Sequence, residues 1–347
     1  MKALMLREYK RLEVVEVPAP VPAPDEVLVR VKACGICGSD VHGYDGSSGR
    51  RIPPIIMGHE AAGTVAEIGS NVSGIRQGDR VTLDSTIYCG SCEYCSRGEV
   101  NLCNRRQVLG VSTPEYRRPG AFADYVLVPP RIIHPLPDDL SFAEAAMVEP
   151  LAVAVHAVSL SETKENSTAL VVGAGMIGIL ALQALRAAKC SRVYVSDIDA
   201  TRLRLAEQLG ATATINARQP DAGAEIQRLT SGVGVDLALE AVGNSAAIKT
   251  AIDSVRKGGT VILIGNVSPT VEIPLQAVVA RQIRLQGSAA SSGEYPHCID
   301  MLARSAVEVK PLITAVSPLE EGPQWFERLH SGEPNLMKVI LSPGGTQ

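Results

Sequence analysis

Four cysteines in one short stretch carry the strongest chemical signal in the sequence. They follow the pattern C-x2-C-x2-C-x7-C and are Cys89, Cys92, Cys95 and Cys103. Thiolates at this spacing are typical of a tetrahedral Zn²⁺ site in which the protein fills every coordination position, so the metal is structural. A bacterial ferredoxin run begins the same way, but its fourth cysteine follows after three residues and precedes proline, whereas Asn104 follows here. The pattern therefore favours a structural zinc lobe over residues 86–106 rather than an iron–sulfur cluster.

A second set of metal-binding side chains is spread along the chain. Cys37, His59, Glu60 and Glu149 supply one thiolate, one imidazole and two carboxylates. Such a set suits a zinc ion that keeps one coordination position for water or substrate, so it predicts a catalytic metal. Each residue taken singly also fits a structural role, and only the fold can bring them together.

A glycine pattern indicates nucleotide binding. The run Val171–Ile179 reads as a strand, a G-x-G-x-x-G turn and the start of a helix. These glycines permit a tight turn and a close approach of backbone to pyrophosphate, while the helix N-terminus offers N–H groups to phosphate. Asp197 ends the next predicted strand, where a carboxylate accepts hydrogen bonds from the adenosine ribose and repels a 2′-phosphate, so the predicted cofactor is NAD rather than NADP. The predicted cofactor-binding residues are Gly173, Gly175, Ile177, Gly178, Asp197 and Arg202.

The elements that must position these residues fall into two classes. In the first 150 residues, short segments such as Glu26–Lys32 and Gly63–Ile68 alternate apolar and polar side chains between turn residues, which predicts half-buried strands. From about residue 168, apolar strand-like runs alternate with helical stretches, which predicts an α/β fold with a doubly wound, parallel, six-stranded sheet. Those runs are Ala169–Gly173, Arg192–Asp197, Thr212–Asn216, Val235–Glu240, Thr260–Gly265 and Ile283–Gly287. The last residues, including Met337–Leu341, return to short mixed elements.

Length, charge and cysteine content narrow the class of protein. At 347 residues and 36.6 kDa the chain is long for one core, which predicts two domains. The net charge is −4 and the charges are interspersed, so we expect no nucleic-acid partner. The first residues show no secretion signal, and the eight cysteines point to metal ligation, so we expect a cytoplasmic protein. The apolar run Ala169–Leu185 contains three glycines and reads as strand, turn and buried helix, so we expect no membrane span.

Several motifs together resemble one known family. GICGSD around Cys37, GHE at Gly58–Glu60, the four-cysteine lobe, GDRV, GAFADYV and G-x-G-x-x-G occur in the order seen in zinc-dependent medium-chain dehydrogenases. The chain is most similar to the polyol branch, which includes sorbitol, L-iditol and galactitol-1-phosphate dehydrogenases, because Glu149 stands where alcohol dehydrogenases place a third zinc-binding cysteine. The resemblance implies a GroES-like, β-rich catalytic domain at residues 1–155, a Rossmann NAD-binding domain at 156–290, and a segment at 291–347 that returns to the catalytic domain.

The resemblance also implies roles for individual residues. Cys37 and His59 match catalytic zinc ligands, and Glu60 and Glu149 match carboxylates that members use directly or through water, which gives two zinc ions per chain with the structural one. Ser39 matches the hydroxyl that takes the substrate proton, and His42 matches the outer member of that relay. The implied reaction is oxidation of a secondary alcohol to a ketone, with the proton leaving through Ser39 and hydride passing to NAD⁺. Relatives are homodimers or homotetramers, which suggests a strand edge within Val261–Ile273 as an interface.

The substrate stays open between a polyol and a polyol phosphate. Sorbitol dehydrogenases carry an Arg-Tyr pair after the last Rossmann strand, where this chain has residues 287–290, Gly-Ser-Ala-Ala. Paired arginines at 50–51 and 117–118 suit a phosphate, although two loop arginines are more often a solvated surface. L-Threonine 3-dehydrogenase-like activity is an alternative within enzymes, and a non-catalytic zinc- and nucleotide-binding sensor is an alternative outside them. Cys34, Cys190 and Cys298 match no ligand position and are expected to pack.

Overall fold

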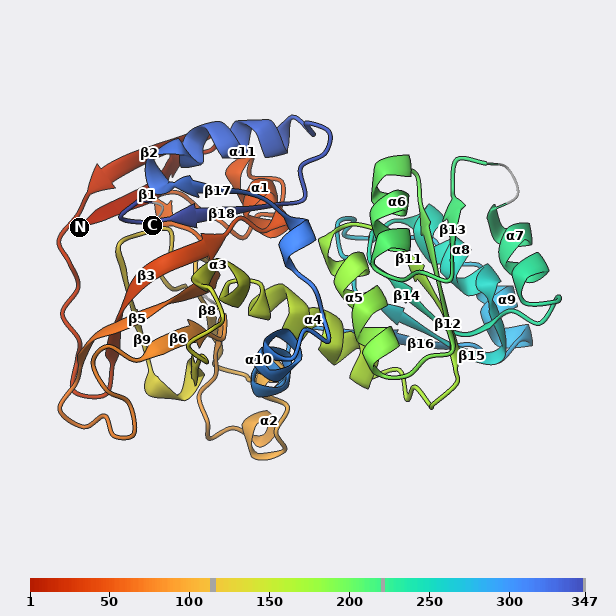
Figure 1. Ribbon diagram of the computed structural model, residues 1–347, viewed down its shortest axis with the longest axis horizontal. Helices are drawn as coiled ribbons and strands as arrows, with labels where there is room; N and C mark the ends of the chain where they lie inside the picture. Colours follow the sequence, from red (N-terminus) through yellow and green to blue (C-terminus); the bar gives the residue numbers. More distant parts are fainter. Residues whose placement is uncertain (113–116, 220–221, 346–347) are drawn as a thin grey trace. The chain divides into compact units, whose positions relative to one another are not determined.

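The computed structural model describes residues 1–112, 117–219 and 222–345 and divides the chain into two compact units (Figure 1). The first unit comprises Met1–Glu149, Tyr295–Arg304 and Val309–Gln347, and the second comprises Pro150–Glu294 and Ser305–Glu308. The N-terminal segment of the first unit therefore ends at Glu149, whereas the boundary predicted from the sequence lies after residue 155. The C-terminal part of the chain belongs mostly to the first unit.

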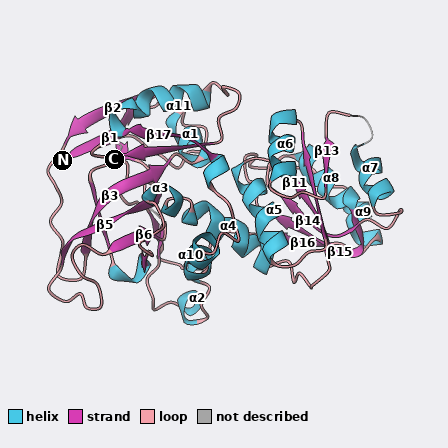
Figure 2. Ribbon diagram, viewed as in Figure 1, coloured by secondary structure: helices cyan, strands magenta, loops and turns pink. Residues whose placement is uncertain are grey.

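The first unit is rich in strands (Figure 2). Its strands are β1 (Lys2–Glu8), β2 (Arg11–Glu16), β3 (Val27–Gly35), β4 (Ile55–Ile56), β5 (Glu60–Ile68), β6 (Arg80–Leu83), β7 (Thr86–Ile87), β8 (Gln107–Val108), β9 (Tyr125–Val128), β10 (Ile133–Pro135), β17 (Ile313–Pro318) and β18 (Lys338–Ser342). Its α-helices include α1 (Gly38–Tyr44), α2 (Glu93–Ser96), α3 (Phe142–Ala145), α10 (Tyr295–Ala303) and α11 (Gly322–His330). Short 3-10 turns lie at Val100–Leu102, Pro130–Ile132, Lys310–Leu312 and Leu319–Glu321.

The main sheet of the first unit joins the two ends of the chain. Its strand order is β10-β6-β5-β3-β18-β17, with β9 also paired to β3. Along β3, Val29 and Val31 are buried while Arg30 is exposed, which is the alternation that the sequence predicts. Strand β18 pairs antiparallel with β3, with Leu341 opposite Cys34. The C-terminal strand thus lies beside the segment that leads into Cys37.

The second unit is an α/β fold. Its strands are β11 (Thr168–Val172), β12 (Arg192–Asp197), β13 (Ala213–Asn216), β14 (Val235–Glu240), β15 (Val255–Leu263) and β16 (Arg284–Gly287). Its helices are α4 (Val148–Ser159, which starts in the first unit), α5 (Met176–Ala187), α6 (Ala200–Gln208), α7 (Ala222–Leu229), α8 (Ser245–Ser254) and α9 (Leu275–Ala280). The sheet order is β13-β12-β11-β14-β15-β16, and every pairing is parallel, as the sequence predicts.

The core of the second unit explains the apolar runs. Leu170 and Tyr194 of the sheet pack with Ile248 and Ile252 of α8 in one buried cluster. Strands that are covered on both faces need no polar side, so they read as continuous apolar segments. The run Ala169–Leu185 is β11, a glycine turn and α5, as expected from its glycines.

One helical stretch passes a length and composition test for membrane crossing. It runs from Phe142 to Ser159 with a mean hydropathy of 1.3, and 72% of it is buried inside the protein. This degree of burial is what a core helix of a folded unit shows.

Candidate functional site

The four predicted zinc-lobe cysteines come together. The Sγ atoms of Cys89, Cys92, Cys95 and Cys103 all lie within 4.8 Å of one another. Cys92 caps the one-turn helix α2, and strands β7 and β8 pair to close the lobe at its base. Because all four ligands come from one local segment, the arrangement fits a zinc ion with no position left for substrate.

Hydrogen-bond donors lower the pKa of the Cys89 and Cys92 thiols, whereas burial raises the pKa of Cys95 to about 11. The N–H of Ser91 lies 3.5 Å from Cys89 Sγ, and the N–H of Cys89 donates to Cys103 Sγ at 3.2 Å. The Arg105 guanidinium also donates to Cys89 Sγ at 3.5 Å. The hydrogen bond from Ser91, with those of Cys103 and Arg105, lowers the pKa of the Cys89 thiol to about 5. Zinc binds cysteine as thiolate, so the surroundings as well as the spacing fit this metal.

Three of the four predicted catalytic ligands also come together. Ligand atoms of Cys37, His59 and Glu60 lie within 4.8 Å of one another. Cys37 is the N-cap of α1, just after β3 ends, and Glu60 begins β5, which pairs with β3 so that Gly35 lies opposite Glu60. Strand pairing therefore brings a thiol and the His-Glu dipeptide to one place. One sulfur, one imidazole and one carboxylate make a donor set for a zinc ion that keeps an open position.

Asp40 lies behind this cluster and was not among the predicted site residues. Its Oδ1 is 3.4 Å from His59 Nδ1, and its Oδ2 accepts the N–H of Cys37 at 3.3 Å. Burial alone would raise the pKa of Asp40, but the charges of His59 and Arg51 outweigh burial and lower the pKa to about 2. A carboxylate that faces one ring nitrogen of a histidine fixes the ring and presents the other nitrogen to a metal.

Arg51 is buried and already has hydrogen-bond partners within the protein, so it is not free to bind a substrate phosphate. The side chain is only 4% exposed, and its Nη2 lies 3.1 Å from Asp40 Oδ1 and 3.2 Å from Ser39 Oγ. Arg118 is likewise engaged, since its Nη2 donates to Glu26 Oε1 at 2.9 Å. One arginine of each predicted pair is therefore occupied by a protein carboxylate rather than free for a substrate phosphate.

Glu60 shares its carboxylate with a buried lysine. Lys338 Nζ donates to Glu60 Oε1 and Oε2 at 2.8 and 2.6 Å and to the carbonyl of Ile36 at 3.1 Å. Burial lowers the pKa of Lys338, but the charges of Glu60, Cys37 and Glu149 and the hydrogen bond to Glu60 together outweigh burial, so the net shift is upward. A Cβ at position 35 would lie 2.1 Å from Glu60 Oε2, so glycine there leaves the space for the carboxylate. The carboxylate has a cation to pair with in the absence of a metal.

Glu149 lies outside the group of three ligands but close to it. Ser85 Oγ donates to Glu149 Oε1 at 2.9 Å, and the N–H of Ser85 lies 3.4 Å from the hydroxyl of Tyr295. Burial raises the pKa of Glu149, while His59 opposes this shift and Glu60 adds to it. His134 stacks on Tyr295 with ring centroids 4.9 Å apart. Ser85, Tyr295 and His134 therefore form a group of polar side chains next to Glu149.

The two predicted proton-relay residues lie on α1. Ser39 and His42 are both exposed and three positions apart, so they share one face of the helix. His42 Nδ1 lies 3.4 Å from Ser47 Oγ. Ser39 follows Cys37 closely in the chain, which places a hydroxyl next to the metal-ligand cluster.

The glycine turn of the second unit has the shape that dinucleotide binding needs. A Cβ at position 178 would lie 1.7 Å from the carbonyl oxygen of Gly173, so only glycine permits this contact of helix and strand. Gly175 caps α5, and a Cβ there would meet nothing within 4 Å among the described residues. Ile177, in the first turn of α5, is half-buried. The open space in front of a helix N-terminus is what a pyrophosphate requires.

Asp197 ends β12 beside this turn. Its Oδ2 accepts the N–H of Ala174 at 2.6 Å, and its Oδ1 accepts the N–H of Asp199 at 2.8 Å. Arg202 lies on α6, where its Nε is 3.9 Å from Asp199 Oδ2. The carboxylate thus supports the glycine turn, and its remaining lone pairs are still available to a ribose.

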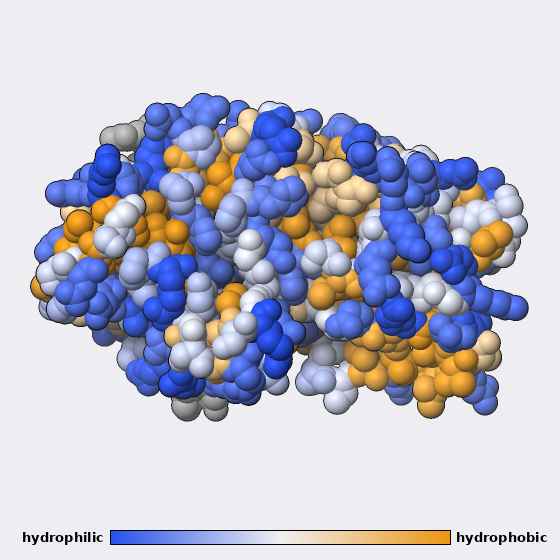
Figure 3. Space-filling model, turned by 90° about the horizontal axis from the view of Figure 1, so that it is seen from below, coloured by the Kyte–Doolittle hydropathy of each residue, from blue (hydrophilic) through white to orange (hydrophobic). Residues whose placement is uncertain are grey.

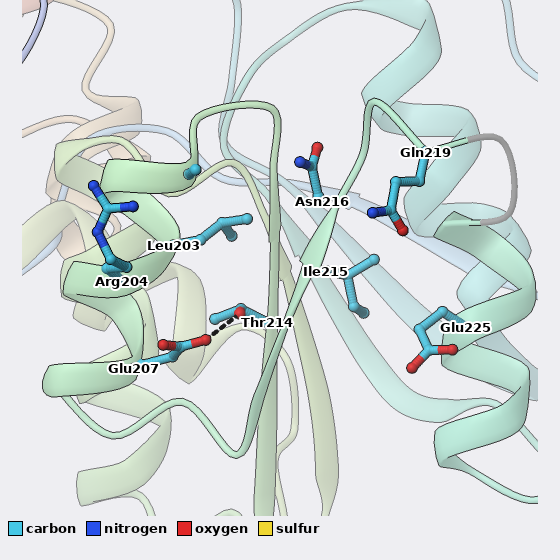
Figure 4. Close-up of a pocket in the computed structure, with 9 residues that line it drawn as sticks. Leu203, Arg204, Glu207, Thr214, Ile215, Asn216, Gln219 and Glu225 are labelled. Atoms are coloured by element: carbon cyan, nitrogen blue, oxygen red, sulfur yellow. Dashed lines mark hydrogen bonds between the residues drawn. The ribbon is translucent and has the colours of Figure 1, made fainter.

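A cavity of about 430 Å³ in the second unit follows the edge strand β13 (Figure 4). It lies between α6 and α7, and one side carries a hydrogen bond from Thr214 Oγ1 to Glu207 Oε1 at 2.5 Å. Its lining contains no cysteine or histidine and none of the predicted cofactor-binding residues. Two of those residues lie beside the lining: Asp197 is opposite Asn216 in the sheet, and Arg202 precedes Leu203 on α6. We assign this cavity no part in the chemistry.

The residues that sequence reasoning missed share one property. Asp40, Ser85 and Lys338 are all buried polar side chains that contact a predicted site residue. Arg51 is buried in the same way, but the sequence indicated it for phosphate and not for a contact with Ser39. Lys338 had the clearest signal in the sequence, because a lysine at the start of the apolar strand β18 needs a buried partner for its charge. Of the cysteines expected to pack, Cys34 and Cys298 are buried and Cys190 is half-buried.

Comparisons with known proteins identify the family of this chain. Residues 23–138 match the alcohol dehydrogenase GroES-like domain, and residues 177–304 match the zinc-binding dehydrogenase domain. The chain is 37% identical to sorbitol dehydrogenase of Bacillus subtilis, over 99% of this chain and 97% of that protein. It is 34% identical to D-arabitol-phosphate dehydrogenase of Enterococcus avium, over 96% and 94%.

A solved structure shows the same fold along the whole chain. A zinc-binding dehydrogenase from Sinorhizobium meliloti, crystallised with NADP, is 35% identical, with a TM-score of 0.88 and 99% of each chain covered. The motifs, the parallel sheet and both ligand clusters lead to the same assignment as these relatives. This chain belongs to the zinc-binding medium-chain dehydrogenases, in their polyol dehydrogenase branch, and is an oxidoreductase.

Proposed function

We propose that this protein oxidises a secondary alcohol of an unphosphorylated polyol to a ketone, with NAD⁺ as the hydride acceptor. The observation that carries the proposal is the grouping of Cys37, His59 and Glu60, with ligand atoms within 4.8 Å of one another. Ser39 adds an exposed hydroxyl two positions after Cys37. Together these residues supply metal ligands and a proton acceptor in one place.

Each residue takes a defined part in this proposal. Cys37, His59 and Glu60 would hold the catalytic zinc, and Glu149 would act through a water molecule because it lies outside the group of three. Zinc at this position supplies Lewis acidity that lowers the pKa of a substrate hydroxyl. Ser39 Oγ accepts the hydroxyl proton and releases its own proton towards solvent, with His42 as the outer member on the same helix face.

The second unit would bind the nucleotide. Gly173, Gly175 and Gly178 bring backbone N–H groups close to a pyrophosphate, and Asp197 accepts hydrogen bonds from the adenosine ribose. NAD⁺ held by these residues would supply the hydride acceptor that the two-electron oxidation of an alcohol requires. We favour NAD over NADP because Asp197 would repel a 2′-phosphate, although a related structure holds NADP. The ratio of kcat/KM for the two cofactors tests this choice.

The choice of a free polyol rests on the arginines. D-Arabitol-phosphate dehydrogenase is among the relatives, so phosphate recognition is the alternative. Arg51 is buried against Asp40 and Arg118 is paired with Glu26, which leaves these two guanidiniums engaged within the protein. A panel that compares free polyols with their phosphates, including galactitol-1-phosphate, decides between the two substrate classes.

An oligomer and a cytoplasmic location complete the proposal. Val267, Ile273, Leu275 and Val279 of the second unit are exposed apolar side chains, and Figure 3 shows apolar surface on that unit. Part of the predicted strand edge is wrong, because Val261 is buried in β15, which has neighbours on both sides; the edge strand at this end is β16. We propose a homodimer or homotetramer that covers this surface. All eight cysteines are free of disulfides, which fits a reducing compartment.

The experiment that tests the function is a substrate screen followed by NADH absorbance. It compares wild type with Cys37→Ala on polyols, polyol phosphates, simple secondary alcohols and L-threonine. We expect turnover of at least one polyol by wild type and none by the variant. Turnover of L-threonine alone, or wild-type activity in Cys37→Ala, would contradict the proposal.

A further inference from the structure

Arg51 occupies an unusual position for an arginine, because it is buried between two parts of the predicted chemistry. It lies in the loop between α1 and β4 and is 4% exposed. The same nitrogen, Nη2, lies 3.2 Å from Ser39 Oγ and 3.1 Å from Asp40 Oδ1. Asp40 in turn faces His59 Nδ1 at 3.4 Å. One guanidinium therefore connects the proton-accepting serine with the carboxylate that orients a metal ligand.

The local structure is shaped to hold this side chain. A Cβ at position 43 would lie 2.0 Å from Arg51 Cγ and 2.8 Å from its Cβ, so the glycine in α1 leaves the space through which the arginine passes. Glycine within a helix is unfavourable, so its presence there needs a local reason, and the arginine supplies one. The next residue is fixed as well, because Ser112 Oγ accepts the N–H of Ile52 and donates to its carbonyl at 2.9 Å.

The hydrogen-bonding capacities of the two groups give the contact a direction. A guanidinium only donates and stays charged, whereas a serine hydroxyl has one proton and two acceptor lone pairs. Ser39 must therefore accept from Arg51, and its own O–H must point to another acceptor. One lone pair of Ser39 remains for the proton of a substrate hydroxyl. The positive charge also favours negative charge on the serine oxygen while the proton moves.

We propose that Arg51 is a positioning residue for proton transfer, which fixes Ser39 Oγ and sets the direction in which the serine passes its proton. The proposal rests on the proposed function and assigns Arg51 no contact with substrate or cofactor. Asp40 links the same guanidinium to His59, so the proton acceptor and the metal ligand are held in one geometry. The proposal gives Arg51 no role in the recognition of a phosphate.

Substitution of Arg51 by methionine, which has no donor, tests the proposal. We expect Arg51→Met to lower kcat by about ten- to a hundredfold, a part of what a positioned proton acceptor contributes. The KM for the polyol should stay within about threefold, because the arginine touches no substrate. Arg51→Lys keeps a charged donor but reaches fewer acceptors, so it should recover part of kcat.

The double variant Ser39→Ala/Arg51→Met shows whether the arginine acts through the serine. In the Ser39→Ala background the second substitution should change kcat by less than about twofold, because the group that it positions is gone. A full additional loss of kcat in the double variant would overturn the proposal.

Arg80→Met is the matched control for loss of an enclosed arginine. Arg80 lies in the same unit, its guanidinium carbon is 4.2 Å from the centre of the Phe142 ring, and its Nη2 donates to Leu140 O. Like Arg51, it has an Nε without a hydrogen-bond partner among the described residues. We expect Arg80→Met to lower the melting temperature and to leave kcat unchanged. Equal effects of the two variants on kcat would overturn a specific role for Arg51.

Two further measurements separate this proposal from a loss of metal and from a failure of the proposed function. The zinc content of Arg51→Met should equal that of wild type, and a drop to one zinc per chain that explains the lost activity would overturn the proposal. A crystal structure of Arg51→Met should show Ser39 Oγ displaced or in two positions. An unchanged serine would overturn positioning even if kcat falls. A displaced serine in an enzyme that oxidises no polyol would support positioning and refute only the polyol reaction.

Discussion

The two metal-ligand clusters of the first unit are built in opposite ways. All ligands of the four-cysteine cluster come from residues 89–103, and the helix between them, α2, buries none of its residues. The cluster of Cys37, His59 and Glu60 instead takes its ligands from the ends of two paired strands, with support from Lys338, which is 278 positions away from Glu60. The first cluster has little packing to hold it without a metal, whereas the second is held by a sheet, a helix cap and buried ion pairs.

The difference implies that the four-cysteine site serves the stability of the protein and that the site of Cys37, His59 and Glu60 serves its activity. A closed site with a sparse core contributes its metal-binding free energy directly to folding. An open site on a preformed sheet contributes chemistry, and its metal can leave without loss of the fold.

Cysteine substitutions should give the largest effects. Cys37→Ala removes one ligand of the open cluster, so we expect at least about a 10³-fold loss of kcat, which is several kcal/mol of barrier, with little change in melting temperature. Cys92→Ala removes one ligand of the closed cluster, so we expect low solubility and a loss of several kcal/mol of stability. Turnover, circular dichroism and zinc content measured on both variants check this pair.

Ser96→Ala serves as a control within the closed lobe, because among the described residues the carbonyl of Cys92 is the one acceptor of the Ser96 hydroxyl. It should behave as wild type in both respects. A soluble, stable Cys92→Ala protein with one zinc per chain would contradict the contrast, as would an unfolded Cys37→Ala.

Metal removal should separate the clusters in one sample. A chelator of moderate affinity at neutral pH should take the metal from the open cluster first, because that site keeps a position for an incoming ligand. We expect nearly complete loss of turnover with the melting temperature retained, and recovery on addition of Zn²⁺. Simultaneous loss of both metals and of the fold would show that the clusters do not differ in this way. Zinc analysis after each step of a chelator titration gives the measurement.

The local or long-range origin of the ligands also explains how much of each site could be predicted from the sequence. The spacing of Cys89 to Cys103 lies within one local segment, so the ligand set follows from the sequence alone. The glycine turn at Gly173–Gly178 and the strand ending at Asp197 are local as well, and the structure has both where the pattern predicts them. For Cys37, His59 and Glu60 the residue types suggested a metal, but the family resemblance was needed to join them.

The supporting side chains were out of reach for a physical reason. Arg51 belongs to a pair of loop arginines, and such pairs are usually solvated; it is buried here because Gly43 leaves room for its stem and Asp40 pairs its charge. The side chain of Lys338 reaches Glu60 because β18 pairs with β3, and that pairing is long-range. A sequence pattern predicts which side chains of one helix or strand are buried. The contacts of Arg51 and Lys338 depend instead on how separate elements pack and pair, which the pattern does not show.

Lys338→Met should give an effect of intermediate size. Without the lysine, Glu60 is a buried carboxylate without a cationic partner in the metal-free protein, so we expect a loss of about 3 kcal/mol of stability. The loss should be smaller in the zinc-loaded protein, because the metal then supplies the positive charge. Urea unfolding with and without zinc, followed by the fluorescence of Trp325, which lies in the first unit and is the chain's single tryptophan, reports the difference.

The double variant Glu60→Gln/Lys338→Met removes both charges and is the control for this pair. It should recover most of the stability lost in Lys338→Met, since neither partner is left buried alone. An equal loss in metal-free and zinc-loaded Lys338→Met would mean that Glu60 does not exchange its partner between lysine and metal.

Acid sensitivity on the Glu149 side should give the smallest effect at neutral pH, because it develops only as the pH falls. Burial lowers the pKa of His134 from 6.5 to about 4 in the folded protein. The unfolded chain therefore binds more protons between these values, and the free energy of unfolding falls as the pH drops from about 6.5 to about 4. The contribution that is complete above pH 6.5 and lost below pH 4 is about 3 kcal/mol as an upper estimate.

His134→Phe keeps a ring against Tyr295, 4.9 Å away in the native stack, and removes the titrating group. Because other groups also titrate, the quantity to measure is the difference in urea midpoint between wild type and variant at several pH values from 7.5 to 4.5. That difference should grow in favour of the variant as the pH falls. His297→Gln, an exposed histidine on α10, should show no such trend. Parallel curves for wild type and His134→Phe would mean that His134 takes up its proton without cost to the fold.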